Sequence, residues 1–202
     1  MIGAATTTAS ASFLFLIPQN TGLTAVGDKT ARKLTTAFGR LGLALESGVS
    51  KECQEKVLDQ IGLSGLNVSD FLAFLGQGAN FYNGEKSTAT VAGNVGTLSW
   101  SNAAYGKGAT ISGVFNSQPG IMALSSMVNT TMTVFFRENY VNSMNVNRLI
   151  GFLFHEALHA YGQGDFNYSD QRLKAAFGIA ESEPSERISD YIHEHCFKKG
   201  IL

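Results

Sequence analysis

The segment His155-Glu156-Ala157-Leu158-His159 combines two imidazoles and a carboxylate at a spacing that suits metal chemistry. On an α-helix, residues four positions apart lie on one face, so the two histidines can bind the same metal ion. Glu156 is offset by about 100° from His155, so it can reach a metal-bound water without becoming a ligand. Zinc lowers the pKa of such a water to about 7, and a neighbouring carboxylate can take its proton. The segment therefore predicts one zinc ion per chain, with Glu156 as general base.

The segment lies where the apolar pattern already calls for a helix. Apolar residues recur at helical spacing from Asn145 to Tyr161, and Gly162 follows as a stop signal. Two further helices are expected after it, over 169–177 and 185–198, each opened by a serine. The metal segment is thus expected near the end of the longest helix of the C-terminal part.

Helices and short strands are expected upstream of the metal segment. Helical spacing and capping residues predict helices over 28–46, 50–61 and 71–75. Short β-prone runs separated by Gly, Asn and Pro predict a small antiparallel or mixed sheet, over 87–92, 96–101, 109–115 and 130–136. With 202 residues and no visible linker, the chain is expected to form one α+β domain over 1–202.

The composition excludes several classes of function. The chain is 44% hydrophobic, so it can bury a core, but only 15% charged, with a formal net charge of −1. Such a balanced charge gives no field that would attract nucleic acid or an anionic membrane. No apolar run approaches the roughly 18 residues that a membrane-spanning helix needs. We therefore expect neither nucleic acid nor a membrane span. The expected partner is a peptide or protein substrate, on the ground of the zinc-binding segment and not of the composition.

The extended segment His155-Glu156-x-x-His159-x-x-Gly162-x-x-Asp165 resembles the zinc motif of metzincin-type metallopeptidases, in the variant with Asp as third ligand. Small bacterial zinc proteases of the snapalysin type have this form. The resemblance implies a zincin-like fold, zinc bound by His155, His159 and Asp165, and peptide hydrolysis. One departure stands out, because metzincins place a methionine turn after the third ligand and the last methionine here is Met144.

A second resemblance points to a different third ligand. The segment Ser185-Glu186-Arg187-Ile188-Ser189-Asp190 is similar to the Asn-Glu-x-x-Ser-Asp segment of thermolysin-like gluzincins. That resemblance implies Glu186 as the third ligand and Asp190 as the residue that orients the first histidine. Asp165 is favoured because a turn at Gly162 can return it within one short loop. Glu186 and Asp170 remain alternatives.

Other candidate residues carry weaker signals. Zincins often use a Tyr or His to stabilise the oxyanion, and Tyr168 is taken as that residue, whereas Tyr161 is expected to pack in the core. The cluster of His193, His195 and Cys196 crowds one helical turn. We interpret it as a helix end with a buried or bridged cysteine, with a second zinc site as the alternative.

The two cysteines, Cys53 and Cys196, form no CxxC pair and can be one disulfide or two buried thiols. A disulfide is favoured because low charge and abundant small polar residues are typical of exported proteins. The chain carries no charge before Asp28, and we read its start as mature chain from which an export signal has been removed. An intact signal with a weak basic region is the alternative. A secreted or periplasmic location is expected.

These observations together predict a zinc-dependent metallopeptidase in which Glu156 deprotonates the attacking water and returns the proton to the leaving amine. One alternative is a zincin scaffold that only binds a partner, with a structural metal. An intact Glu156 argues against it, because a structural site needs no general base. Another alternative is a zinc amidase that acts on cell-wall peptides.

Overall fold

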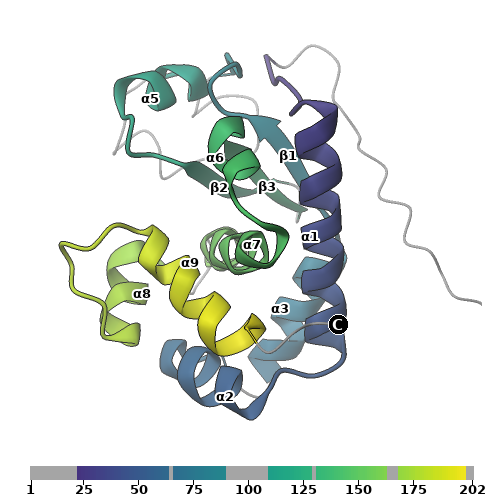
Figure 1. The fold of residues 1–202 in the computed structure, drawn as a ribbon, viewed down its shortest axis with the longest axis vertical. Coiled ribbons are helices and arrows are strands. Elements are labelled where there is room, and N and C mark those ends of the chain that lie inside the picture. Colours follow the sequence, from purple (N-terminus) through teal and green to yellow (C-terminus); the bar gives the residue numbers. More distant parts are fainter. Residues whose placement is uncertain (1–21, 64–65, 90–108, 129–130, 163–167, 199–202) are drawn as a thin grey trace, which may run out of the picture.

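A computed structural model describes residues 22–63, 66–89, 109–128, 131–162 and 168–198 of the protein. The fold is α+β. Along the chain, helices come before, between and after the strands of a small sheet (Figure 1). Its elements are, in chain order, α1 (Asp28–Glu46), α2 (Lys51–Cys53), η1 (Gln54–Leu58), η2 (Asp59–Ile61), α3 (Leu66–Gly76), β1 (Ala79–Asn83), α5 (Ile111–Ser117), β2 (Ala123–Val128), β3 (Thr131–Phe136), α6 (Glu138–Ser143), α7 (Val146–Tyr161), α8 (Asp170–Phe177), α9 (Glu186–Ile192) and η3 (His193–Phe197).

Helix α7 is the central element of the fold. The Asn145 side chain caps its start by accepting a 2.8 Å hydrogen bond from the Arg148 amide, and Gly162 follows its last residue. Most of its side chains are buried, because it packs against α1, α9, η3 and the strands β2 and β3. Figure 1 looks along α7, with the sheet above it, α9 and α2 below it, and α1 beside it. The metal segment is therefore enclosed by elements from both halves of the chain.

The sheet has the strand order β1-β3-β2 and is mixed. Strand β3 pairs in parallel with β1 and antiparallel with β2, so that Val134 lies opposite both Phe81 and Ser125. The face toward α7 belongs to the main core, and the other face is covered by a smaller apolar cluster that includes Ile111 and Phe115 of α5. In the part of the chain that the structure describes, β2 is an edge strand.

Most of the helices expected from the sequence are confirmed. The structure has helices at 28–46, 146–161 and 170–177, and continuous helical turns over 51–61 and 186–197. The strand at 130–136 is confirmed as β3. In the C-terminal part of the chain, which carries His155 and His159, the helices thus lie close to the ranges that the apolar periodicity predicts.

Other expectations are wrong. Residues 111–117 form a helix and no strand, because the Thr110 hydroxyl accepts a 3.0 Å hydrogen bond from the Gly113 amide and caps the first turn. Helix α3 covers Leu66–Gly76, so it begins before the expected start at residue 71. Residues 87–89 of the run expected at 87–92 form no strand, and 90–92 and 96–101 lie outside the described residues. The sequence analysis did not predict the elements β1, β2 and α6.

Two long-range links hold the helices in place. Cys53 and Cys196 form a disulfide, as expected, which joins α2 to η3. The Lys33 ammonium of α1 donates hydrogen bonds to the carbonyls of Val141, Asn142 and Met144, and so fixes the turn from which α7 starts. Among the described residues, no helix is long and apolar enough to cross a membrane.

Candidate metal centre

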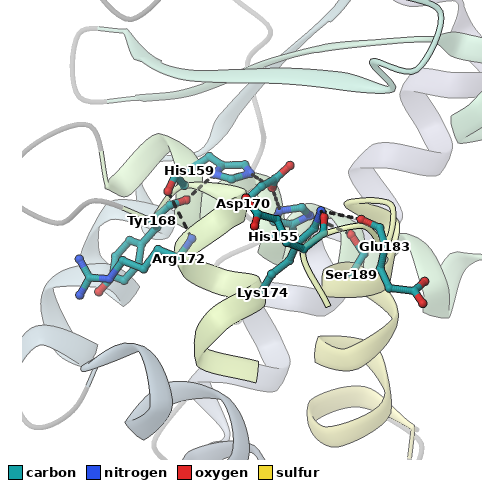
Figure 2. Close-up of polar contacts among 10 residues, drawn as sticks. His155, His159, Tyr168, Asp170, Arg172, Lys174, Glu183 and Ser189 are labelled. Carbon is teal, nitrogen blue, oxygen red and sulfur yellow. Dashed lines mark hydrogen bonds and ion pairs between the residues drawn. The ribbon is translucent and has the colours of Figure 1, made fainter. Parts of the chain in front are cut away.

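Three side chains from two helices converge on one point. His155 and His159 project from the same face of α7, and each places its Nε2 atom 3.0 Å from Oδ1 of Asp170, the first residue of α8 (Figure 2). The three atoms lie within 4.8 Å of one another. Nitrogen and oxygen ligands of a tetrahedral zinc ion are themselves about 3.3 Å apart, so a small adjustment of these side chains would seat the ion. The group can therefore hold a metal ion.

The position of Asp170 follows from how α7 ends and α8 begins. Gly162 ends α7, residues 163–167 lie outside the described part, and the Tyr168 carbonyl lies beside His159 near that end. The Ser169 side chain then caps α8 by accepting a 3.4 Å hydrogen bond from the Arg172 amide. Asp170 thereby occupies the first turn of α8, where a carboxylate is favoured by the helix dipole.

The hydrogen bonds of His159 define its tautomer. Its Nδ1 lies 2.6 Å from the backbone carbonyl of Tyr168, and a carbonyl can only accept, so Nδ1 carries a hydrogen. In the neutral imidazole, Nε2 is then an acceptor that faces the Asp170 carboxylate, which is also an acceptor. Two acceptors 3.0 Å apart require a cation between them, either a proton or a metal ion. This arrangement fits a metal centre, in which a second partner commonly holds the distal nitrogen of each histidine.

The charges at this point favour the ionised carboxylate. Burial raises the pKa of Asp170, but the hydrogen bonds from His155 and His159 outweigh it and hold that pKa well below its usual range. Burial likewise lowers the pKa of His159, but its hydrogen bond with Asp170 and the charge of Glu156 outweigh burial and raise it. A carboxylate that stays ionised is the form that binds a divalent cation.

His155 is held from its other side by α9. Its Nδ1 lies 3.0 Å from Oγ of Ser189, and both side chains are almost fully buried. Asp190, the residue that the gluzincin resemblance assigns to this role, instead forms a bidentate ion pair with Arg148, at 2.8 and 3.1 Å. Ser189 lies in the segment that resembles gluzincins, but that resemblance assigned it no function.

Glu156 is buried beside the group formed by His155, His159 and Asp170. The residue is only 5% exposed. It lines a cavity of about 610 Å³ that also borders on His155, His159 and Asp170. The opposite wall of the cavity is the edge strand β2 and the residues just before it, Gly120 to Ser125. This buried carboxylate therefore borders the space in which a substrate would lie.

Of the three candidates for the third ligand, the structure describes Asp170 and Glu186. Asp170 makes the contact with both histidines, although the sequence favoured Asp165, which lies outside the described residues. Glu186 lines the same cavity but forms no hydrogen bond with either histidine. The serine at 169 predicted where α8 starts, but the sequence did not predict that this start lies beside His155 and His159.

Tyr168 contacts the centre through its backbone. Its ring packs beside Tyr161, with ring centroids 6.5 Å apart, and lies under the Arg172 guanidinium. In Figure 2 the ring extends away from the two imidazoles and Asp170. The role in oxyanion stabilisation therefore gains no support from this geometry, and the carbonyl that holds His159 is the contribution the structure describes. Tyr161 packs in the core, as expected, against Phe71 and Phe74.

The second histidine cluster does not form a comparable group. Cys196 is in the disulfide, His195 pairs with Glu52 at 3.0 Å, and His193 lies against α7. Within the described residues, the group formed by His155, His159 and Asp170 is the one whose ligand atoms come close enough to hold a metal ion.

No protein-family model matches the chain, and no curated protein or solved structure matches it. Any functional conclusion therefore depends on the geometry of these residues.

Proposed function

We propose that this protein is a zinc-dependent metallopeptidase, in which His155, His159 and Asp170 bind zinc and Glu156 is the general base. The observation that carries the proposal is the convergence of the three ligand atoms on one point, beside a buried carboxylate that lines the same cavity. The ligand set of two histidines and one carboxylate is typical of catalytic zinc sites, which keep a fourth position for water.

Each residue has a role that follows from its contacts. Zinc, when bound, would polarise the scissile carbonyl and lower the pKa of a water molecule. Glu156, next to the ligands in sequence and on the wall of the same cavity, takes the proton of that water and delivers it to the leaving amine. The Tyr168 carbonyl and the Ser189 hydroxyl hold the distal nitrogens of the two histidines, so both rings present Nε2 to the metal.

The shape of the cavity supports a peptide as substrate. Strand β2 pairs with β3 along one side only, among the described elements, and its residues Ala123 to Ser125 line the cavity. An extended peptide can add to such an edge through main-chain hydrogen bonds, which would place one of its carbonyls near the metal. The disulfide favours a secreted or periplasmic location for this activity, because disulfides persist in oxidising compartments.

The two alternative functions differ from this proposal in what Glu156 and the cavity would do. A scaffold with a structural metal has no use for a buried carboxylate that faces the cavity. A zinc amidase acting on cell-wall peptides would use the same residues, and it would cleave cell-wall fragments in preference to unfolded protein.

The test is the variant Glu156→Gln, with Glu186→Gln as the matched control on the same cavity. Wild type is expected to bind one zinc ion per chain, measured by elemental analysis, and to cleave an unfolded protein substrate, measured by mass spectrometry. Glu156→Gln should keep the zinc and lose about a thousandfold in rate, or roughly 4 kcal/mol of barrier. Wild type without transition metal, or a variant that keeps most of its activity, would refute the mechanism.

A further inference from the structure

Helices α7 and α9 approach each other unusually closely at Gly151. A Cβ atom at this position would lie 2.6 Å from the Ser189 carbonyl oxygen and 2.8 Å from Cβ of His193. Contacts that short do not occur between real Cβ atoms and their neighbours, so α9 can lie this close only where α7 lacks a side chain. Gly151 therefore sets how near the whole of α9 comes to α7.

The close approach bears directly on the metal centre. Gly151 and His155 are four residues apart on α7, so they lie on the same face of the helix. Ser189, whose carbonyl rests on Gly151, also points its hydroxyl at Nδ1 of His155, 3.0 Å away (Figure 2). A serine side chain is short, and a displacement of α9 by one ångström would break this hydrogen bond.

We propose that Ser189 is the positioning residue for His155 and that Gly151 makes its placement possible. The Ser189 oxygen accepts the Nδ1 hydrogen of His155, which fixes the ring orientation and leaves Nε2 as the atom that faces Asp170. In the observed arrangement Asp190 pairs with Arg148, and Ser189 is the residue that contacts Nδ1 of His155. The inference rests on the proposed function in that zinc is the ion bound at Nε2.

A purely structural role for Ser189 predicts different behaviour. In that case, removal of the hydroxyl would change the stability of the protein and leave the affinity for zinc unchanged. Ser185 provides the matched control. It lies on the same stretch of chain and lines the same cavity, but its side chain makes no capping hydrogen bond and none with His155.

The first experiment measures zinc affinity by competition with a chelator for wild type, Ser189→Ala and Ser185→Ala. Ser189→Ala should bind zinc ten- to a hundredfold more weakly, as is usual when the partner of a ligating histidine is removed. Ser185→Ala should match wild type. In the zinc-loaded proteins, NMR should detect the Nδ1 hydrogen of His155 in wild type and Ser185→Ala, and lose it to exchange with water in Ser189→Ala.

A double-mutant cycle tests the link to Gly151. Gly151→Ala should displace α9 and weaken zinc binding to a similar extent, and adding Ser189→Ala should then change the affinity less than threefold. Independent losses that multiply would refute the link. Equal affinities for Ser189→Ala and wild type would refute the positioning role while leaving the proposed function intact, whereas wild type that binds no zinc would overturn both. If Gly151→Ala does not fold, the comparison of the two serine variants decides.

Discussion

The two histidine pairs of this chain differ in whether their spacing lets both rings contact one carboxylate. His155 and His159 are four residues apart on α7, their ring centroids lie 4.5 Å apart, and both face the same oxygen of Asp170. His193 and His195 are two residues apart on η3, about 200° around the helix from each other. One of them lies against Gly151 and the other against Glu52, on different elements.

A carboxylate beside a histidine does not by itself make a metal centre. His195 and Glu52 approach as closely as His155 and Asp170 do, at 3.0 Å in both cases. The His195 and Glu52 side chains are 21% and 41% exposed, much like those of His159 and Asp170 at 23% and 43%. The difference is that His155 is only 3% exposed and shares its carboxylate with a second imidazole. The α7 pair therefore belongs to a converging ligand set, and the η3 pair belongs to the attachment of η3 to α2.

The largest effect should come from the attachment of η3, through the disulfide beside His195. The bond between Cys53 and Cys196 spans 143 positions of sequence. The chain-entropy model gives about 5 kcal/mol for a loop of that length. Replacing both cysteines with Ala should lower the free energy of unfolding by that order in urea titrations.

The same variant tests the separation of the two regions. Folded Cys53→Ala/Cys196→Ala protein should bind zinc within a few-fold of wild type. If zinc binding were lost while stability was retained, the η3 region would have to be counted as part of the metal centre.

Matched carboxylate substitutions compare the two histidine pairs directly. Asp170→Asn should weaken zinc binding about a hundredfold or more, roughly 3 kcal/mol, because an anionic ligand is replaced by a neutral one. Glu52→Gln should leave the affinity for zinc unchanged. Isothermal titration of both variants with zinc measures this difference.

The same titration distinguishes the candidate third ligands. Asp165→Asn and Glu186→Gln are expected to bind zinc as wild type does. A loss confined to Asp165→Asn would restore the ligand that the sequence motif favours, and a loss confined to Glu186→Gln would favour the gluzincin arrangement.

The sequence predicted those parts of the site that depend on local spacing. The periodicity over 145–161 and the serine at 169 placed α7 and α8 within a residue of their observed bounds. The contact of Asp170 with both histidines could not be predicted in the same way, because it depends on where the start of α8 lies relative to α7 in space.

The residues that the sequence missed act through long-range packing. Ser189 reaches His155 only because α9 crosses α7 at a glycine, and the two residues are 34 positions apart. Strand β2 has serines at its centre and lacks the β-branched run that marks β3, so it is recognised only by its pairing with β3. Residues 111–117 show the reverse, since a local cap at Thr110 outweighs their β-propensity.

The metal-free protein should show how the converging site behaves without its ion. The pKa of His159 is raised above its ordinary value of 6.5, mainly by Asp170 and against the effect of burial, so its stabilising contribution is complete below about pH 6.5 and is lost at higher pH. The pKa of Asp170 is lowered, so its contribution is lost only in acid. In EDTA, the free energy of unfolding should therefore fall between pH 6 and pH 9.

Two controls define this pH dependence. Asp170→Asn should remove most of the decline, because it removes the carboxylate that raises the pKa of His159. With zinc added, the trend should reverse, since deprotonated ligands bind the ion more tightly as the pH rises. Urea titrations at several pH values measure all three cases, and a metal-free wild type whose stability rises from pH 6 to pH 9 would contradict the assignment.

The smallest effect should come from the His195–Glu52 pair itself. Both side chains are partly exposed, so water screens their attraction, and exposed pairs of this kind contribute about 0.2–1 kcal/mol. A double-mutant cycle with Glu52→Ala and His195→Ala, measured at pH 5.5 where an ordinary histidine is protonated, should give a coupling in that range. The coupling should fall further in 1 M salt, where the Debye length is about 3 Å.

His195 also contacts the Tyr191 ring, with ring centroids 4.4 Å apart, so the single variant His195→Ala should lower the free energy of unfolding by more than the coupling. A salt-resistant coupling above about 2 kcal/mol would mean that water does not screen this pair, and the contrast between the two regions would then depend on convergence alone.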